Sequence, residues 1–301
     1  MKNSFFEKRW GVFNHYLYGS PGGVNEYQTL CSDWNQRTEE LDVEKIAAQL
    51  HQIGAQYYFI TLMQGRKYML APNETFDRIA ETKPGEACAR RDVVADLIAA
   101  LDPYGIDLCL YYTGDGPYKD EEIGRRFGFV EPRKNVSLDF VTRWAAVLEE
   151  YSLRYGEHIK AWWIDGCYDY FGYRKELLDL YHRAAQAGNK SAAVAFNNGV
   201  KPELNAWGGS DFTTGEFNDF TYIPKSPFVD GAKAHILAPL GVMPDGKPGG
   251  AWCCPGVKRD HAYMKEYIDH VNQAGGMVTV DLYIASDGAF DPMQMEVLRG
   301  I

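Results

Sequence analysis

The chain has 301 residues, of which 46% are hydrophobic and 24% charged, a composition typical of a globular protein with a large core. Its formal net charge is −10, and Lys and Arg are scattered along the chain, which argues against nucleic-acid binding because phosphate neutralisation needs a basic surface. Aromatic residues make up 14%, and their rings offer faces on which sugars and other planar ligands stack.

The N-terminal sequence MKNSFFEKRWGVF lacks the apolar run and the small-residue cleavage site of a signal peptide, and no later stretch approaches about 18 apolar residues. These features predict a cytoplasmic protein without membrane partners, although a secreted chain whose leader has been removed would begin in the same way. The six cysteines show neither CxxC nor paired zinc spacing. We therefore expect free buried thiols and neither a metal nor a cofactor; the six are Cys31, Cys88, Cys109, Cys167, Cys253 and Cys254.

Short apolar runs alternate with longer amphipathic segments along the chain. The runs predict strands at residues 9–16, 55–63, 106–113, 159–165, 191–198, 210–216, 232–241 and 275–284. Helices are predicted at residues 41–54, 90–105, 137–156, 173–188 and 259–275. Eight strands with helices between most of them predict an α/β fold, a closed (β/α)8 TIM-like barrel formed by a single domain over residues 1–301.

Polar residues end several of the predicted strands. Asp165 ends the fourth strand, in the sequence WWIDG, at the face where such barrels carry their active sites. The alternative is an ordinary loop aspartate that caps the next helix. Other polar or aromatic residues at the same rim are His15, Gln64, Arg66, Tyr111, Tyr112, Asn197, Asn198, Glu216 and Asp281.

Two carboxylates in an aromatic cleft suit glycoside hydrolysis, in which one attacks or steadies the sugar carbon and the other moves a proton. Metal chemistry fits less well, because the sequence contains neither HxH nor HExxH. A lone His15 on an apolar strand is more often structural than catalytic.

An ordered series of motifs resembles the α-L-fucosidases of glycoside hydrolase family 29. RWGVFNHYLYG is similar to their FGIFIHWGLYS-like first strand, IGAQYYFITL to AGAKYVVLT, and WWIDG to the WFDG that carries the nucleophile. RRDVVADLIAALDPYGIDLCLYYT resembles RDLV…GLKLGLYYS, SDFTTGE resembles D(F/Y)xTPE, and GGMVTVDLYIASDGAF resembles GGNLLLNIGPxxDG. Each motif is weak alone, whereas the ordered series, which spans nearly the whole chain, is fairly specific.

The resemblance implies a retaining exo-glycosidase with Asp165 as the nucleophile and His15 as a contact of the innermost sugar. Glu216, in the TTGE match, is our choice of general acid/base, and Glu203 in KPELN is the second choice, more often an exposed loop residue. The substrate would be an oligosaccharide or another glycoside. We predict substrate contacts from His15, Gln64, Arg66, Tyr112, Trp163, Asn198 and Trp252.

Two departures from the family pattern predict an altered sugar specificity. Where the family has Lys-His-His-Asp-Gly-Phe, this chain has MQGRKY, so Gln64 and Gly65 replace the histidines and Arg66 replaces the aspartate. The arginine that often follows the fifth strand is also missing from FNNGV. We therefore expect a sugar other than plain α-L-fucose. Arg66 would suit a carboxylate or sulfate on that sugar, or equally an internal salt bridge.

The β-sandwich that usually follows the family's barrel is not found before Ile301, so we expect one domain and a possible homo-oligomer that completes the cleft. The Gly- and Pro-rich segment 243–257, which contains Trp252, is either a sugar-stacking loop or a packed surface loop. Two other functions stay open. One is a non-catalytic carbohydrate-binding barrel that has lost hydrolase activity. The other is an unrelated barrel enzyme such as an aldolase, although Lys160 lies at the wrong end of its strand for a Schiff base.

Overall fold

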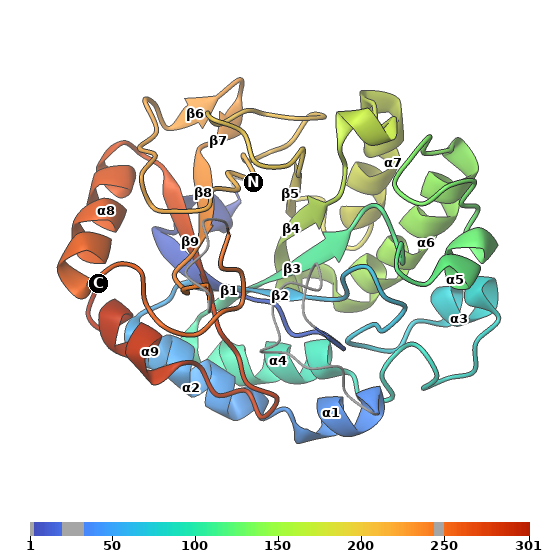
Figure 1. The fold of residues 1–301 in the computed structure, drawn as a ribbon, viewed down its shortest axis with the longest axis horizontal. Coiled ribbons are helices and arrows are strands. Elements are labelled where there is room, and N and C mark those ends of the chain that lie inside the picture. Colours follow the sequence, from blue (N-terminus) through green and yellow to red (C-terminus); the bar gives the residue numbers. More distant parts are fainter. Residues whose placement is uncertain (1–2, 20–32, 244–249) are drawn as a thin grey trace.

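A computed structural model describes residues 3–19, 33–243 and 250–301. Its centre is a curled sheet of seven parallel strands in the order β5-β4-β3-β2-β1-β9-β8 (Figure 1). The strands are β1 (Trp10–Asn14), β2 (Tyr57–Thr61), β3 (Asp107–Thr113), β4 (Ile159–Asp165), β5 (Ala193–Phe196), β8 (His235–Pro239) and β9 (Met277–Leu282). A separate antiparallel pair consists of β6 (Phe228–Val229) and β7 (Ala232–Lys233). The sequence prediction of a (β/α)8-like barrel is confirmed.

Five of the helices were predicted from their amphipathic pattern, and they surround the sheet. They are α2 (Val43–Ile53), α4 (Val93–Leu101), α6 (Leu138–Tyr155), α7 (Lys175–Ala185) and α8 (His261–Gln273). Four further helices were not predicted, because they have seven residues or fewer and two turns are too short to show a helical period. They are α1 (Trp34–Glu40), α3 (Glu74–Ala80), α5 (Glu121–Arg126) and α9 (Pro292–Leu298). Short 3-10 turns are η1 (Ser4–Glu7), η3 (Asp102–Tyr104), η4 (Gly156–His158) and η5 (Asp169–Phe171).

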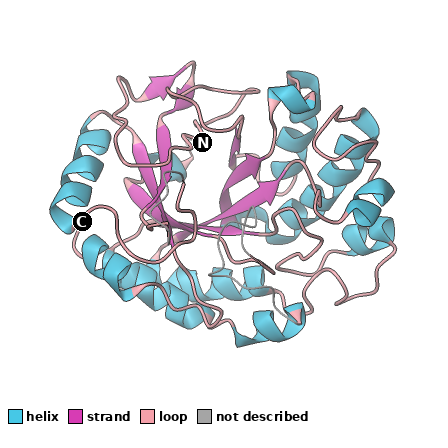
Figure 2. Cartoon of the chain, in the orientation of Figure 1, coloured by secondary structure: helices cyan, strands magenta, loops and turns pink. Residues whose placement is uncertain are grey.

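The sixth predicted strand, residues 210–216, is not a regular strand, although it lies between β5 and β8. Side chains replace part of its ladder, because Val194 N donates to Asp211 Oδ2 at 2.9 Å and Phe196 N donates to Ser210 Oγ at 2.9 Å. On its other side it makes isolated parallel bridges, Phe212 with Lys233 and Glu216 with Leu237. Residues 197–234, which the structure describes completely, contain no α-helix, and Figure 2 shows loops and the β6-β7 pair on this side of the barrel.

Successive residues of each strand point to opposite faces of the sheet, which separates the core into two clusters. Phe13, Tyr57, Phe59, Tyr111 and Trp163 belong to the cluster inside the barrel. The larger cluster, which packs between the sheet and the helices, includes Val12, Tyr58, Ile60, Tyr112 and Trp162. Neighbours in sequence such as Tyr111 and Tyr112 therefore lie on different sides of the barrel wall.

The N-terminal end of the barrel interior is closed by Phe5 of η1. Its ring makes edge contacts with Tyr57, Phe59 and Phe212, at centroid distances of 5.1, 6.1 and 5.4 Å. Aromatic contacts of this kind add to the free energy gained from burying the rings. Phe5 therefore fills the barrel interior beneath Tyr57 and Phe59 at the N-terminal ends of the strands.

A buried histidine sits in the barrel interior. His235 Nδ1 lies 2.9 Å from the carbonyl oxygen of Thr213, which can only accept, so Nδ1 carries the proton. Nε2 then accepts from Thr279 Oγ1 at 2.6 Å. Burial lowers the pKa of His235 from 6.5 to about 4, because the charged imidazolium loses its hydration there.

This pKa predicts a loss of stability in acid. Below pH 6.5 His235 is protonated in the unfolded chain, whereas in the folded chain it stays neutral until the pH falls to about 4. The free energy of unfolding therefore falls as the pH falls from 6.5 to about 4. The expected loss from this one group is about 3 kcal/mol. Urea denaturation between pH 4 and 7 should show a shallower acid decline for His235→Gln, and equal slopes for the two proteins would contradict the assignment.

Cys88, Cys109, Cys167 and Cys254 are buried free thiols, as predicted. Cys253 is also buried, and Cys31 lies outside the described residues. Among the described helices, none has the combined length and apolarity that crossing a membrane requires.

Candidate active site

Asp165 is the last residue of β4 and lies at the C-terminal mouth of the barrel. Its carboxylate accepts two hydrogen bonds, one from Tyr111 OH to Oδ2 at 2.6 Å and one from Asn197 Nδ2 to Oδ1 at 2.7 Å. The interpretation of Asp165 as a helix cap is wrong, because the next α-helix, α7, has Arg174 at its N-cap. The half-buried carboxylate is instead held by two side chains at the mouth.

Gly166 allows the chain to turn away directly after Asp165. It has φ of +69°, in the left-handed region that favours glycine. A Cβ at this position would lie 2.4 Å from the carboxyl group of Asp115, a residue that is 3% exposed. Any larger residue after Asp165 would therefore displace Asp115.

Glu216 faces Asp165 across the mouth. Asn197 Nδ2 donates to Glu216 Oε2 at 2.6 Å as well as to Asp165 Oδ1 at 2.7 Å. Because both bonds share the Nδ2 atom, the two oxygens lie no more than 5.3 Å apart, the sum of the two lengths. In retaining glycosidases the carboxyl groups are about 5–5.5 Å apart, and in inverting enzymes about 6.5–9.5 Å. The upper limit of 5.3 Å is compatible with the retaining geometry and lies below the range of inverting enzymes.

The surroundings of Glu216 favour the protonated form of its carboxyl group. Burial, followed by the negative charge of Asp165, raises the pKa of Glu216 from 4.5 to about 7, and the hydrogen bond from Asn197 opposes this rise. Near neutral pH the protonated form of Glu216 is therefore populated beside Asp165. A buried carboxyl group whose pKa is raised towards neutrality beside a second carboxyl group is typical of acid/base catalysis.

Asn197 is the residue that joins the two acids, and the sequence analysis chose its neighbour Asn198 as the ligand contact. Asn197 Oδ1 accepts from Thr214 Oγ1 and Gly199 N, at 3.2 and 3.1 Å, which fixes the amide so that its Nδ2 faces the carboxylates. Asn198 is 9% exposed and accepts from Asp169 N, so it supports a loop. The signal was available in the strand alternation, since Ala193 and Ala195 point into the barrel and Asn197 follows at the same period.

The acids open into a small cavity of about 70 Å³. Besides the two acids, four of the predicted substrate contacts line it, and aromatic and apolar neighbours complete the wall. The lining residues are Phe13, His15, Gln64, Tyr111, Trp163, Asp165, Glu216, Leu237 and Trp252. The amide oxygen of Gln64 is buried there without a hydrogen-bond partner in the described chain. A buried unpaired acceptor costs free energy, so it is suited to accept from a ligand hydroxyl.

His15 is oriented by a buried carboxylate. Its Nδ1 lies 2.8 Å from Asp281 Oδ2, and Asp281 Oδ1 accepts from Cys253 N at 2.7 Å. Burial raises the pKa of Asp281 and the nearby His15 lowers it. The ring of His15 packs 6.0 Å from that of Trp252, which brings the segment after residue 249 to the cavity. Of the predicted loop 243–257, residues 244–249 lie outside the described ranges.

Three predicted contacts do not line the cavity. Tyr112 is wrong, because it points away from the barrel interior and its hydroxyl donates to Trp144 O at 2.9 Å, so the adjacent Tyr111 takes its place. Asn198 is absent from the cavity lining and accepts from Asp169 N in the adjacent loop. Arg66 lies beyond Gln64 and outside the cavity wall. The second-choice acid, Glu203, is exposed and pairs with Lys225 at 3.4 Å.

Tyr168 is a further aromatic residue at the mouth that the sequence analysis missed. The negative charge of Asp165 raises the pKa of its phenol, and burial and the charge of Glu216 raise it further. It follows Asp165 by three residues, and only the folded loop reveals the proximity. Within residues 3–19, 33–243 and 250–301 no group of three His, Cys, Asp or Glu side chains could hold a metal ion.

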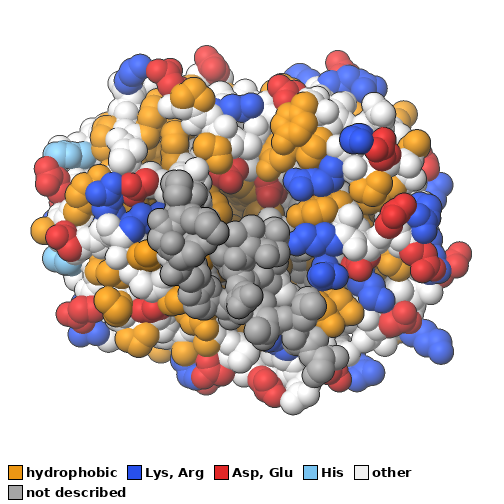
Figure 3. Space-filling model, viewed as in Figure 1, with side chains coloured by type: hydrophobic (Ala, Val, Ile, Leu, Met, Phe, Trp, Pro, Cys, Tyr) orange, Lys and Arg blue, Asp and Glu red, His pale blue; other side chains and the backbone are white. Residues whose placement is uncertain are grey.

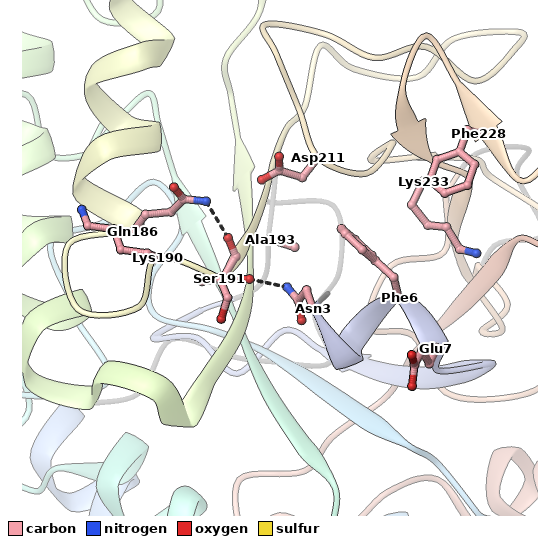
Figure 4. Close-up of a pocket in the computed structure, with 11 residues that line it drawn as sticks. Asn3, Phe6, Glu7, Gln186, Lys190, Ser191, Ala193, Asp211, Phe228 and Lys233 are labelled. Atoms are coloured by element: carbon pink, nitrogen blue, oxygen red, sulfur yellow. Dashed lines mark hydrogen bonds between the residues drawn. The ribbon is translucent and has the colours of Figure 1, made fainter. Parts of the chain in front are cut away.

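A larger cavity, of about 510 Å³, lies at the opposite end of the barrel (Figure 4). It is bordered by Phe6 of η1, by Ala193 at the start of β5 and by Lys233 of β7, whereas Asp165 lies at the end of its strand. The carboxylate of Asp211 in this cavity already accepts from Val194 N and pairs with His182 at 3.3 Å. Because no matched acid pair lies there, we place the candidate site at the smaller cavity.

No protein-family model and no curated protein matches the chain. Among solved structures, a bacterial fucosidase with a phenyl-triazole pyrrolidine inhibitor superposes with a TM-score of 0.69 and 17% identity, covering 99% of this chain and 71% of that one. A second similar structure is an α-L-fucosidase of glycoside hydrolase family 29 from Bacteroides thetaiotaomicron, trapped as a covalent intermediate with 2-fluoro-fucosyl fluoride. It superposes with a TM-score of 0.68 at 16% identity, and the match covers 99% of this chain and 72% of that one.

An endo-fucoidan hydrolase of glycoside hydrolase family 107 gives a TM-score of 0.72 at 16% identity, covering 99% of this chain and 52% of that one, so the chain spans about half its length. At these identities the likeness concerns the fold, and it includes nearly every residue of the chain. The chain therefore has the fold of the barrels in these fucosidases and fucoidan hydrolases.

Proposed function

We propose that the chain is a retaining glycoside hydrolase with Asp165 as the nucleophile and Glu216 as the general acid/base. The observation that carries this proposal is the pair of carboxyl oxygens held within 5.3 Å of each other by one amide group. The structural neighbours are fucosidases and a fucoidan hydrolase, which supports a fucose-like sugar as the substrate. The altered residues Gln64 and Gly65 support a sugar that differs from plain α-L-fucose.

In the first step Asp165 attacks the anomeric carbon while protonated Glu216 gives its proton to the leaving oxygen, producing a covalent glycosyl-enzyme and a free alcohol. Tyr111 and Asn197 orient the attacking carboxylate through their hydrogen bonds. In the second step Glu216 takes a proton from water, and the water oxygen replaces Asp165 at the anomeric carbon.

The charge of Asp165 controls the pKa of Glu216 in both steps. The charge of Asp165 contributes to the raised pKa of Glu216 in the free enzyme. Esterification of Asp165 removes that charge, so the pKa of Glu216 falls and the group becomes an ionised base when water must be activated. The pair thus supplies an acid for the first step and a base for the second without any other ionisable group.

The proposal is tested with a panel of aryl α-L- and β-D-glycosides, followed by a 2-fluoro glycosyl fluoride of the sugar that turns over. We expect intact-mass spectrometry to show one glycosyl adduct, and peptide mapping to place it on Asp165. An adduct on another residue would contradict the assignment. Binding of glycosides without turnover of any of them would support the non-catalytic carbohydrate-binding barrel instead.

A further inference from the structure

Three loops bring basic side chains together around Tyr118 at the mouth of the barrel. Lys119 N donates to Gly65 O at 2.6 Å, and a Cβ on Gly65 would lie 2.7 Å from the Tyr118 ring, so the loop after β2 packs directly on the loop after β3. The guanidinium carbon of Arg133 lies 4.3 Å and the ammonium of Lys119 5.9 Å from the centre of that ring. Arg66 follows Gly65, and we call Arg66, Lys119 and Arg133 the basic rim.

The positive charge of the basic rim is only partly balanced. Arg133 Nε pairs with the buried Asp115 Oδ2 at 2.9 Å. Within the described chain, neither Arg66 nor Lys119 has a carboxylate oxygen within 4.0 Å. Burial, Arg66 and Arg133 lower the pKa of Lys119, and Asp120 raises it. Cations that repel one another and are partly desolvated are unfavourable until an anion joins them.

The basic rim lies beside the candidate site. Asp115, the partner of Arg133, packs against Gly166, which follows Asp165. Gln64, two residues before Arg66, lines the cavity. In Figure 3, basic side chains lie to the right of the central hollow, in which acidic side chains are visible. When a ligand enters the cavity, the part of it that remains outside would therefore lie near the basic rim.

We propose that the basic rim binds an anionic group, a sulfate ester or a carboxylate, on the part of the glycoside that lies outside the cavity. An arginine guanidinium binds such oxygens with two parallel hydrogen bonds, and a lysine ammonium adds a point charge. The chain has a net charge of −10, so an anionic ligand is repelled by the protein as a whole and needs a local positive site. This proposal rests on the proposed function, because it names the substrate class of that site.

The experiment measures binding without turnover, in the full chain carrying Asp165→Asn. Isothermal titration compares a sulfated fucose oligosaccharide, its desulfated form, a uronic-acid analogue and inorganic sulfate. We expect at least one charged oligosaccharide to bind about tenfold more tightly than the neutral one at low salt, and this preference to shrink as NaCl is added. The ligand that shows the preference identifies sulfate or carboxylate as the group.

Two variants locate the binding. Adding Arg66→Gln and Lys119→Gln together should remove about tenfold of the affinity for the charged ligand and leave the neutral ligand unaffected. Arg143→Gln serves as the control, because this exposed arginine on α6 pairs with Asp139 away from the rim. The proposal would be overturned if no charged ligand bound more tightly than the neutral one. It would also be overturned if Arg143→Gln lowered the affinity for the charged ligand as much as the double variant does. Turnover is not used here, so a failure of the proposed hydrolysis is recognised separately by the glycosyl adduct.

Discussion

Asp165→Asn is expected to lower kcat/KM on an aryl glycoside substrate at least about 10⁴-fold, because the amide cannot attack the anomeric carbon. The loss should be similar for good and poor leaving groups, since it affects the attacking group and not the proton donor. Steady-state and single-turnover kinetics measure it. The glycosyl adduct with the 2-fluoro glycosyl fluoride should also disappear.

A readout independent of turnover accompanies this variant. Removing the charge of Asp165 should lower the pKa of Glu216 from about 7, although burial will keep it raised, and carbon-13 NMR of the labelled carboxyl group reports it directly. Asp169→Asn is the matched control, because Asp169 lies four residues on and is exposed, and its carboxylate accepts from Tyr170 N and not from a group of the acid pair. Full activity of Asp165→Asn, or an unchanged pKa of Glu216, would show that the two acids do not work together.

Glu216→Gln is expected to lower kcat/KM about 10²- to 10⁴-fold for substrates with poor leaving groups. Aryl glycosides with acidic phenols need little protonation, so their first step should be affected far less. In the wild type, activity should fall as pH rises through about 7, because the acid loses its proton there. The variant should lack this fall.

The comparison of leaving groups and the pH profile distinguish a lost proton donor from a merely damaged fold. Glu203→Gln is the control, because Glu203 was the alternative acid and the structure places it at the exposed surface. If Glu203→Gln instead removed the alkaline fall and Glu216→Gln kept it, the two roles would have to be exchanged.

Much of the fold was readable from the sequence because its signals are local. The amphipathic period of α2 and its glycine C-cap, Gly54 with φ of +78°, are both set by residues close in the chain. The apolar runs gave seven of the strands within a few residues. The segment 210–216 was predicted as a strand and differs, because its pairing with β5 combines one backbone hydrogen bond, from Asp211 N to Val194 O, with bonds to the side chains of Asp211 and Ser210.

The candidate site was readable only in part. The position of Asp165 at the end of β4 follows from its place after an apolar run, and the alternation of strand residues would have separated Tyr111 from Tyr112 and Asn197 from Asn198. The raised pKa of Glu216, by contrast, depends on burial and on a charge that lies 51 positions earlier in the chain. Neither is encoded in the residues next to Glu216.

The sequence by itself determined the alternation of strands and helices, the glycine turns and the strand ends at which polar residues collect, because hydrophobic period and backbone preference act over a few residues. The tertiary structure alone decided that one amide joins two distant acids, that Arg133 and Lys119 both lie near one tyrosine ring, and that burial raises the pKa of Glu216. These properties depend on distance and solvation in space, which only the folded barrel fixes.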